Sequence, residues 1–523
     1  MPRADTGLFI RKSLDSVRSD AANTGLRRSL GPIQLVLVGI GCIIGAGVYV
    51  MTGTAAANYA GPAVIISFMI AGLACAFIGL CYAELSSVLP VSGASYTYAY
   101  VSLGEVIAWA LGWMVMLEFG LAGAALAVGF SGYLQSLLAD FGIHLPSALA
   151  NSFVRGELGP HGMSFVTAPS INLIAALSLA VVTGVLVRGV KHSVAVNTFL
   201  VIVKVGVLIG FVAFGVSHVD VANWTPFLPA NEGGFRYGIP GVFRAASILF
   251  FAYLGFEAVA TAASEARNPQ RDIPVGILGA LFVSTIVYIA VGLVMTGLVS
   301  YHELDVADPI AVAVSAIGLP VVAVLVKVGA LTGLASVLLV NTYGQSRVCF
   351  AIACDGLLPA RFARVHPRFS TPAFTTIVIA SISATAAALL PITLLADLVS
   401  LGTALIFTVV AISVMWLRTT NPDLPRPFKV PLGGVRIRGI WIGTVPVLAI
   451  LASLTMMAPV LTDILSKALD GEWIPSTILL VYLALGAVIY WSYGHRNSRM
   501  RMTALALRAS AGSTVDGPQL RKA

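Results

Sequence analysis

Two apolar segments carry residue types that are unusual in the middle of a helix. The first, Gly39–Gly47, holds four glycines within nine residues. The second, Phe250–Glu257, places Gly255 beside the carboxylate of Glu257. Because each glycine costs a helix about 1 kcal/mol relative to alanine, both segments are predicted to interrupt their helices. Close helix packing through small residues is the alternative interpretation of the first segment.

An interrupted helix exposes backbone groups that can bind a ligand. The start of a half-helix presents unpaired N–H groups and a partial positive charge, which suit a carboxylate; the end of a half-helix presents unpaired carbonyls, which suit an ammonium group. A zwitterion with both groups on one carbon therefore fits a pair of such breaks. The predicted contacts are the amides of Gly45, Ala46 and Gly47 for the carboxylate, the carbonyls of Phe251, Ala252 and Leu254 for the amine, and Ile43 beside the first break.

Three ionisable residues stand inside apolar segments, where such groups are expensive and usually functional. Long apolar stretches flank Lys204 on both sides. Burial disfavours the charged form of a lysine, so Lys204 is predicted to gain and lose a proton during a reaction cycle; snorkelling to an interface is the alternative. Glu118 and Glu257 either pair with Lys204 or the backbone for structure, or lie beside a substrate side chain or on a proton route.

The elements that position these residues follow from the composition. Of the 523 residues 58% are apolar and 10% charged, whereas about a quarter of the residues in soluble domains are charged. Apolar segments of about 20 residues can cross a hydrocarbon core as helices, and no segment shows the alternation of a transmembrane strand. The predicted fold class is an all-α integral membrane protein with twelve transmembrane helices, centred near Val38, Ala71, Val115, Ala180, Val207, Phe250, Ile286, Val337, Ala380, Val410, Ile450 and Ala484.

The two interrupted segments fall in the first and sixth predicted spans, which have opposite directions. Transporters built from inverted repeats place paired broken helices at a midplane substrate site. Helices 1–5 and 6–10 are therefore predicted to form a five-plus-five inverted repeat. The predicted domains are a tail at 1–30, a transport core at 31–418, helices 11 and 12 with their preceding loop at 419–492, and a tail at 493–523 that is expected to lack regular structure.

The net charge of +8 could indicate a nucleic-acid partner, but the placement of basic residues follows the positive-inside rule. With the N-terminus inside, most Lys and Arg residues fall in cytoplasmic segments. Both termini are then cytoplasmic, and the lipid bilayer of a cell (plasma or inner) membrane is the expected surrounding, with no nucleic acid bound. The external segments carry only Arg155, Arg236, Arg244 and Lys467.

The motifs in these segments resemble those of the amino acid–polyamine–organocation superfamily. The resemblance covers roughly residues 25–495 in order and is strongest to the cationic amino acid transporter branch. It implies the five-plus-five, LeuT-type inverted-repeat fold with two C-terminal helices, and transport by alternating access. The residues that carry it are Gly39–Gly47 with Val48–Val50 and Gly61–Pro62, Cys81–Leu85, Pro90–Tyr96, Phe250–Glu257, Glu265–Gln270 with Ile273–Pro274, and Tyr343–Arg347 with Asp355–Pro359.

The same resemblance bears on coupling and on the substrate side chain. Similar sequences carry a lysine at the place of Lys204, where sodium-coupled relatives of the fold bind the ion, which implies a proton as the coupling ion. Similar bacterial sequences have a Glu matching Glu118, usually an Asp at Glu257, and often a hydrophobic residue at Asn341. Two carboxylates and a polar Asn341 favour cationic amino acids, and broad neutral specificity is the equal alternative.

Several other functions are alternatives to proton-coupled uptake. Amino acid exchange uses the same site and stays open, as does a membrane amino acid sensor that does not transport. An enzyme would need a nucleophile–base pair or a metal cluster, and the seven histidines lack ligand spacing. A channel would need rings of charge or a repeated filter. We therefore expect neither catalysis nor a metal or cofactor.

Overall fold

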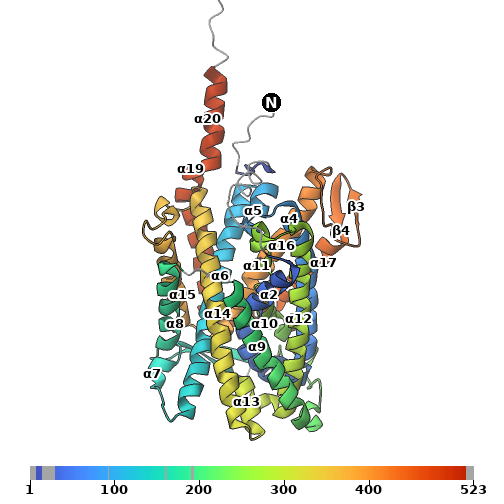
Figure 1. The fold of residues 1–523 in the computed structure, drawn as a ribbon, viewed down its shortest axis with the longest axis vertical. Helices are drawn as coiled ribbons and strands as arrows, with labels where there is room; N and C mark the ends of the chain where they lie inside the picture. The colour runs from blue at the N-terminus through green and yellow to red at the C-terminus, as the bar shows by residue number, and fades with distance from the viewer. Residues whose placement is uncertain (1–7, 15–29, 92, 160–161, 190–193, 514–523) are drawn as a thin grey trace, which may run out of the picture.

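The computed structural model describes residues 8–14, 30–91, 93–159, 162–189 and 194–513. They form one helical bundle, with α20 projecting from the end where residues 8–14 lie and α13 at the opposite end (Figure 1). We call these the tail end and the α13 end. The helices are α2 (Pro32–Ile43), α3 (Thr52–Ala55), α4 (Val64–Val88), α5 (Ala94–Ser102), α6 (Glu105–Asp140), α7 (Ser147–Ala150), α8 (Leu173–Arg188), α9 (Val194–Gly215), α10 (Gly238–Leu249), α11 (Glu257–Thr261), α12 (Pro269–Leu298), α13 (Pro309–Ala316), α14 (Pro320–Cys354), α15 (Ala373–Leu389), α16 (Ile392–Thr420), α17 (Thr444–Leu469), α18 (Ile474–Ile489), α19 (His495–Asn497) and α20 (Arg499–Ser513).

Two antiparallel hairpins and several short helical turns connect these helices. The hairpins are β1 (Val154–Gly159) with β2 (Gly162–Thr167), and β3 (Gly434–Ile437) with β4 (Ile440–Gly443). The hydropathy pattern predicted neither hairpin, because both lie in connections between spans. The π-helical turns are Gly47–Met51, Ala56–Ala60 and Tyr490–Gly494; the 3-10 turns are Gly61–Ala63, Val216–His218, Val221–Trp224, Phe250–Tyr253, Ala262–Glu265, Tyr301–Glu303 and Ala360–Ala363.

The helical content confirms the predicted class, an all-helical membrane protein. Within the described residues, nine helical stretches are long and apolar enough to cross a membrane. Three shorter apolar helices, α2, α8 and α15, supply the remaining predicted spans. All twelve predicted centres lie in helical segments. The shortness of α2 has a direct cause, since it is the first half of a broken span.

The first and sixth spans run beside one another in opposite directions. At the tail end, the amide of Leu30 donates to the carbonyl of Glu265 at 3.0 Å. Towards the α13 end, the amide of Tyr237 donates to the carbonyl of Tyr59 at 2.9 Å. The start of each span therefore meets the end of the other, as two corresponding helices of inverted repeats would.

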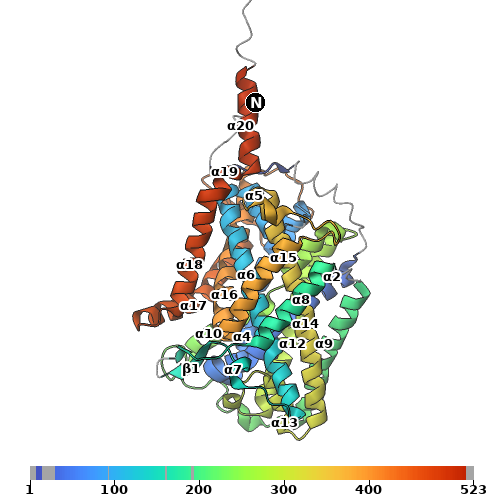
Figure 2. The same cartoon turned by 90° about the vertical axis from the view of Figure 1, so that its left-hand side faces the viewer.

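Long helices hold this pair in place. Helix α12 packs along both α2 and α4, while α6 packs along α14 and α16. The view in Figure 2 shows α18 lying along the outside of the bundle. A ring contact attaches α18 to α6, because Tyr482 of α18 stacks on Trp113 of α6 at 4.8 Å between ring centroids.

A buried ion pair joins the sixth span to the C-terminal half of the bundle. Both terminal nitrogens of Arg244 lie 2.8 Å from carboxylate oxygens of Asp397 on α16, and Nη2 also lies 3.0 Å from Asp463 on α17. The Arg244 side chain is only 1% exposed. The assignment of Arg244 to an external segment was therefore wrong: the residue lies inside α10, where two carboxylates compensate its charge.

The expectation that residues 493–523 lack regular structure was also wrong, up to Ser513. The chain forms α19 and then α20, which extends away from the bundle (Figures 1 and 2). The start of α20 is fixed by the bundle, because the amide of Arg499 donates to the carbonyl of Asp355 at 3.0 Å. The hydroxyl of Ser498 also donates to the buried carboxylate of Glu105. These contacts come from distant residues, so local periodicity did not reveal them.

Replacing Arg244 with methionine is expected to destabilise the fold strongly. Removing one partner of a buried ion pair leaves an uncompensated charge and costs about 3–5 kcal/mol. Thermal unfolding of the purified protein in detergent measures the loss. Arg236→Met is the control, because Arg236 pairs with Glu232 where both side chains are exposed by 36% and 52%. The double variant Arg244→Met/Asp397→Leu should regain part of the stability; equal losses in Arg244→Met and Arg236→Met would contradict the prediction.

Candidate functional site

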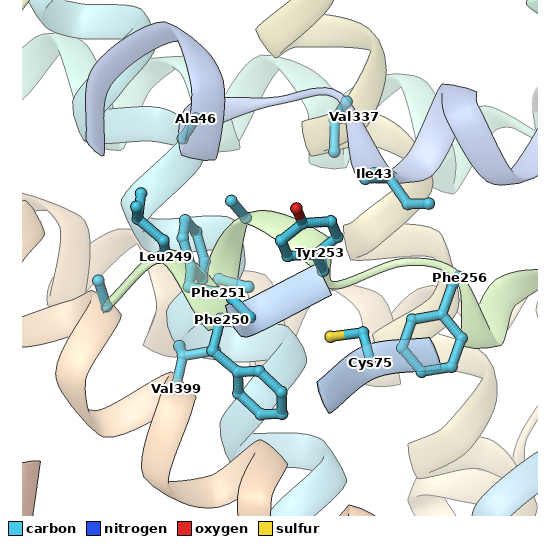
Figure 3. Close-up of a cluster of buried hydrophobic side chains, with 14 of the residues drawn as sticks. Ile43, Ala46, Cys75, Leu249, Phe250, Phe251, Tyr253, Phe256, Val337 and Val399 are labelled. Carbon is cyan, nitrogen blue, oxygen red and sulfur yellow. The ribbon is translucent and has the colours of Figure 1, made fainter. Parts of the chain in front are cut away.

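The first predicted break is present in the first span. Helix α2 ends at Ile43, Ile44 is extended (φ −74°, ψ 100°), and helical structure resumes at Ala46 with a π-helical turn from Gly47. Gly45 and Ala46 are buried, and Figure 3 shows Ile43 and Ala46 on the two sides of the non-helical link. The amides of Gly45, Ala46 and Gly47 thus lie at the start of the resumed helix, where amide groups lack helical acceptors.

The second predicted break is present in the sixth span. Helix α10 ends at Leu249, a 3-10 turn covers Phe250–Tyr253, and Leu254 is extended (φ −54°, ψ 141°) before α11 begins at Glu257. Gly255 has φ +109°, a conformation that side-chain-bearing residues rarely adopt. Phe251 and Ala252 are buried. The carbonyls of Phe251, Ala252 and Leu254 therefore lie at the end of the first half-helix, as expected.

The two breaks face one another through glycine. A Cβ added to Gly47 would come within 2.3 Å of the Cβ of Ala252, and one added to Gly255 would come within 2.7 Å of the carbonyl carbon of Cys42. The second half of the first span thus touches the first half of the sixth. On the other side of the breaks, the first half of the first span touches the second half of the sixth. Gly45 has more room, since its nearest neighbours are side-chain atoms of Leu126 at 3.2 Å and Val337 at 3.5 Å.

Lys204 lies on α9 with its side chain completely buried against the first break. Its ammonium donates to the carbonyl of Gly41 and, at 3.0 Å, to that of Ile44. Its own carbonyl accepts from the hydroxyl of Tyr49 at 3.1 Å. The alternative in which this lysine snorkels to an interface does not fit a side chain with no exposure, because snorkelling keeps the charged end in water.

The carboxylates of Glu118 and Glu257 are both buried. Glu118 accepts from the hydroxyl of Thr403 at 2.7 Å, and Glu257 accepts from the amide of Gly255 at 3.1 Å. Among the described residues no ion pair joins Lys204 to either carboxylate. The alternative in which Lys204 pairs with one of these carboxylates is therefore not realised among the described residues.

Asn341 on α14 is half-buried and points towards α6. Its side-chain amide donates to the carbonyl of Phe119 at 2.5 Å. A Cβ on Gly123 would lie 3.0 Å from the same amide nitrogen. Asn341 is therefore held against the α6 backbone one residue from Glu118, on the same helix as the Val337 that contacts Gly45.

Tyr288 on α12 was not predicted as a site residue, and the structure places it at both breaks. Its hydroxyl lies 2.9 Å from the carbonyl of Ile43 and 2.8 Å from that of Ala252. Thr403, the partner of Glu118, was missed as well. The sequence did offer one signal for Tyr288, since it is a tyrosine in the middle of an apolar span. A buried phenol needs a hydrogen-bond partner, so such a residue indicates a polar group nearby.

The amides at the start of the resumed helix lack helical acceptors, while the carbonyl of Phe251 accepts from the amide of Leu254 at 3.2 Å and that of Ala252 accepts from Tyr288. Backbone of this kind is tolerated at membrane depth only where it lines a cavity or is buried in protein. Figure 3 shows the aromatic side chains of Phe250, Phe251, Tyr253 and Phe256 gathered around the second break. Polar backbone enclosed by apolar side chains can bind the head group of a small zwitterion and exclude water from it.

The variant Gly47→Ala is expected to abolish amino acid uptake by the reconstituted protein. One methyl group would overlap Ala252 and push the two breaks apart. Gly210→Ala on α9 is the control, since no atom lies within 4 Å of the added carbon. Uptake into proteoliposomes and elution on size exclusion measure function and folding separately; a well-folded Gly47→Ala protein with full uptake would contradict the assignment.

Comparison with known proteins identifies the family of this chain. A family model described as "Amino acid permease" matches residues 30–484. The methylthioribose transporter of Bacillus subtilis is 40% identical over 94% of this chain and 99% of its own, and the branched-chain amino acid permease BcaP of the same organism is 40% identical over the same shares. The vacuolar cationic amino acid transporter 4 of Arabidopsis thaliana is 37% identical over 80% of this chain and 68% of its own. The chain belongs to the amino acid permease family, and with it to the amino acid–polyamine–organocation superfamily.

Proposed function

We propose that this protein is a secondary active transporter that takes up amino acids by alternating access. The observation that carries the proposal is the pair of antiparallel breaks that touch at Gly47–Ala252 and Cys42–Gly255. The substrate carboxylate binds the amides of Gly45, Ala46 and Gly47, next to Ile43. The substrate ammonium binds the carbonyls of Phe251, Ala252 and Leu254, which lie across the contact.

The proposed coupling ion is the proton, and Lys204 is its carrier. The ammonium group of Lys204 donates to the carbonyls of Gly41 and Ile44, where α2 ends and the first break begins. When Lys204 loses its proton, the amine loses its positive charge and one of its three N–H donors, so its attraction to the two carbonyls weakens and the break is free to change shape. Binding and release of a proton are thereby linked to the conformation of the half-helix that receives the substrate. Exchange of one amino acid for another remains the rival mode, since it uses the same contacts.

The proposed substrates lean towards cationic amino acids. Glu118 and Glu257 are two buried carboxylates, and a positively charged substrate side chain would compensate such a charge. A neutral amino acid is the second candidate, because Leu126 and Val337 supply apolar surface beside Gly45. Relatives at similar identity are named for branched-chain amino acids, methylthioribose and cationic amino acids, so identity does not choose between the candidates.

The proposed location is the plasma or inner membrane, with the tail end cytoplasmic. The basic residues predicted to be cytoplasmic include Lys12, Arg418 and Arg426, which are paired with carboxylates in the structure. The domain division that accompanies this proposal separates a core at 31–418 from helices α17 and α18. Arg244 links the two parts through Asp463.

Replacing Lys204 with methionine is expected to abolish accumulation driven by a pH gradient while counterflow exchange persists. The variant loses the titrating group but keeps an apolar side chain of similar length in the bundle. Radiolabelled uptake by proteoliposomes with and without an imposed pH gradient measures the effect. Lys327→Met is the control, because this second buried lysine pairs with Asp140, far from the breaks. Wild-type uptake that ignores both the gradient and an uncoupler would defeat proton coupling.

Replacing Glu118 with glutamine is expected to weaken arginine binding about tenfold or more and to leave leucine binding within about twofold. A hydrogen bond to a charged partner is worth about 1.5–3 kcal/mol, and only the cationic side chain loses it. Thermal-shift titration of the purified protein with the twenty amino acids, common polyamines and methylthioribose measures the change. Stabilisation by neutral amino acids alone would select the second candidate, and stabilisation by methylthioribose alone would overturn the zwitterion site.

A further inference from the structure

Tyr288 connects the two breaks through a single hydroxyl group. Its oxygen lies 2.9 Å from the carbonyl oxygen of Ile43, the last residue of α2, and 2.8 Å from that of Ala252 in the second break. Within the described part of the chain, no backbone amide donates to either carbonyl. The hydroxyl of Tyr288 is therefore the hydrogen-bond donor to both of these buried carbonyl oxygens.

The ring of Tyr288 is fixed, so the position of the hydroxyl is fixed as well. The side chain is completely buried on α12. Phe68 packs against it at 5.2 Å between ring centroids, and Tyr253 packs edge-on at 5.4 Å. The hydroxyl of Tyr253 does not compete for the same oxygens, because it donates to the carbonyl of Phe68 at 2.9 Å.

A tyrosine hydroxyl has one proton and so can donate to one acceptor at a time. Two carbonyls share it here, and one of them is left without a donor at each moment. An ammonium group carries three N–H donors and can satisfy both carbonyls together. The geometry of the pair thus favours an ammonium ligand over the resident hydroxyl, and the substrate amine is the group proposed above for the Ala252 carbonyl.

We propose that Tyr288 is a positioning residue that substitutes for the substrate ammonium when the site is empty. This inference rests on the proposed function. In the empty protein the hydroxyl supplies one donor to the Ile43 and Ala252 carbonyls, which would otherwise be buried and unpaired at a considerable cost. When an amino acid binds, its ammonium takes both carbonyls and the hydroxyl loses them. The empty transporter can therefore reorient with one of the two carbonyls paired at each moment, instead of neither.

Tyr288→Phe separates this role from ordinary packing. The variant keeps the ring and removes only the donor. The empty state then has two unpaired carbonyls, while the amino-acid-bound state loses nothing that it used. Substrate binding is expected to tighten about two- to tenfold, the ratio that one neutral hydrogen bond sets. Return of the empty protein is expected to slow, so net uptake falls while exchange, which does not require the empty protein to reorient, is retained.

The experiment uses the purified full-length protein and the amino acid that gives the largest thermal shift among the twenty. Its dissociation constant is measured by titration calorimetry, and net uptake and counterflow are measured in proteoliposomes. Tyr133→Phe is the matched control: Tyr133 is as completely buried, and its hydroxyl donates at 2.7 Å to the carbonyl of Tyr49, which is not among the carbonyls proposed to bind the ammonium. This variant loses one buried hydrogen bond and should keep the wild-type dissociation constant and the wild-type ratio of uptake to counterflow.

Tighter binding in Tyr288→Phe, with counterflow kept and net uptake reduced, supports the inference. Weaker binding, or net uptake and counterflow that fall together, overturns it, as does the same change in affinity in Tyr133→Phe. A Tyr288→Phe protein that binds as the wild type does also overturns it. If no amino acid binds the wild-type protein, the proposed function itself fails. This result differs from one in which the wild-type protein binds and only the Tyr288→Phe variant departs from the expectation.

Discussion

Backbone groups that leave a helix at membrane depth must find partners inside the protein, because no water is present to hydrogen-bond them. In this bundle, two side chains from other helices meet that requirement. Lys204 on α9 donates to Gly41 and Ile44, and Tyr288 on α12 lies between Ile43 and Ala252. The positions of α9 and α12 against the first span are therefore set by the same polar groups that make the breaks useful. A ligand that binds there replaces or adds to donors that the fold already provides.

Glycine has two separate uses at the breaks. Gly255 adopts a backbone conformation that residues with a Cβ avoid, which ends the first half of the sixth span. Gly47 removes a side chain from the place where the two spans touch, so that Ala252 can approach. The cost of glycine in a helix does not arise at Gly255, where the chain is not helical, and at Gly47 the close approach of Ala252 requires a residue without a side chain. The alternative of glycines used for close packing is also realised, at Gly39, where a Cβ would overlap Ala280 on α12.

Much of this could be predicted from the sequence, for identifiable physical reasons. Hydropathy locates spans because length and apolar composition alone decide what crosses a bilayer, and glycines in a span locate breaks because they weaken a helix wherever they stand. The burial of Lys204 followed from its apolar flanks. Partners could not be predicted: Arg244 meets Asp397 across 153 positions of the chain, and Tyr288 meets a carbonyl 245 positions away. The start of α20 depends in the same way on Asp355 and Glu105, and the two hairpins depend on local pairing that hydropathy does not register.

The antiparallel contact of the two broken spans divides them into two mixed pairs. One pair consists of residues 46–60 with α10, and the other of α2 with the segment from α11 to Glu265. Each pair contains one half of each span and is joined at its outer end by a backbone hydrogen bond, Tyr237 to Tyr59 in one and Leu30 to Glu265 in the other. The non-helical links at Ile44–Gly45 and Leu254–Phe256 are all that connects the pairs along these two spans. In the alternating access proposed above, each pair tilts as a unit about these links, so that one compartment gains entry while the pair facing the other compartment stays packed.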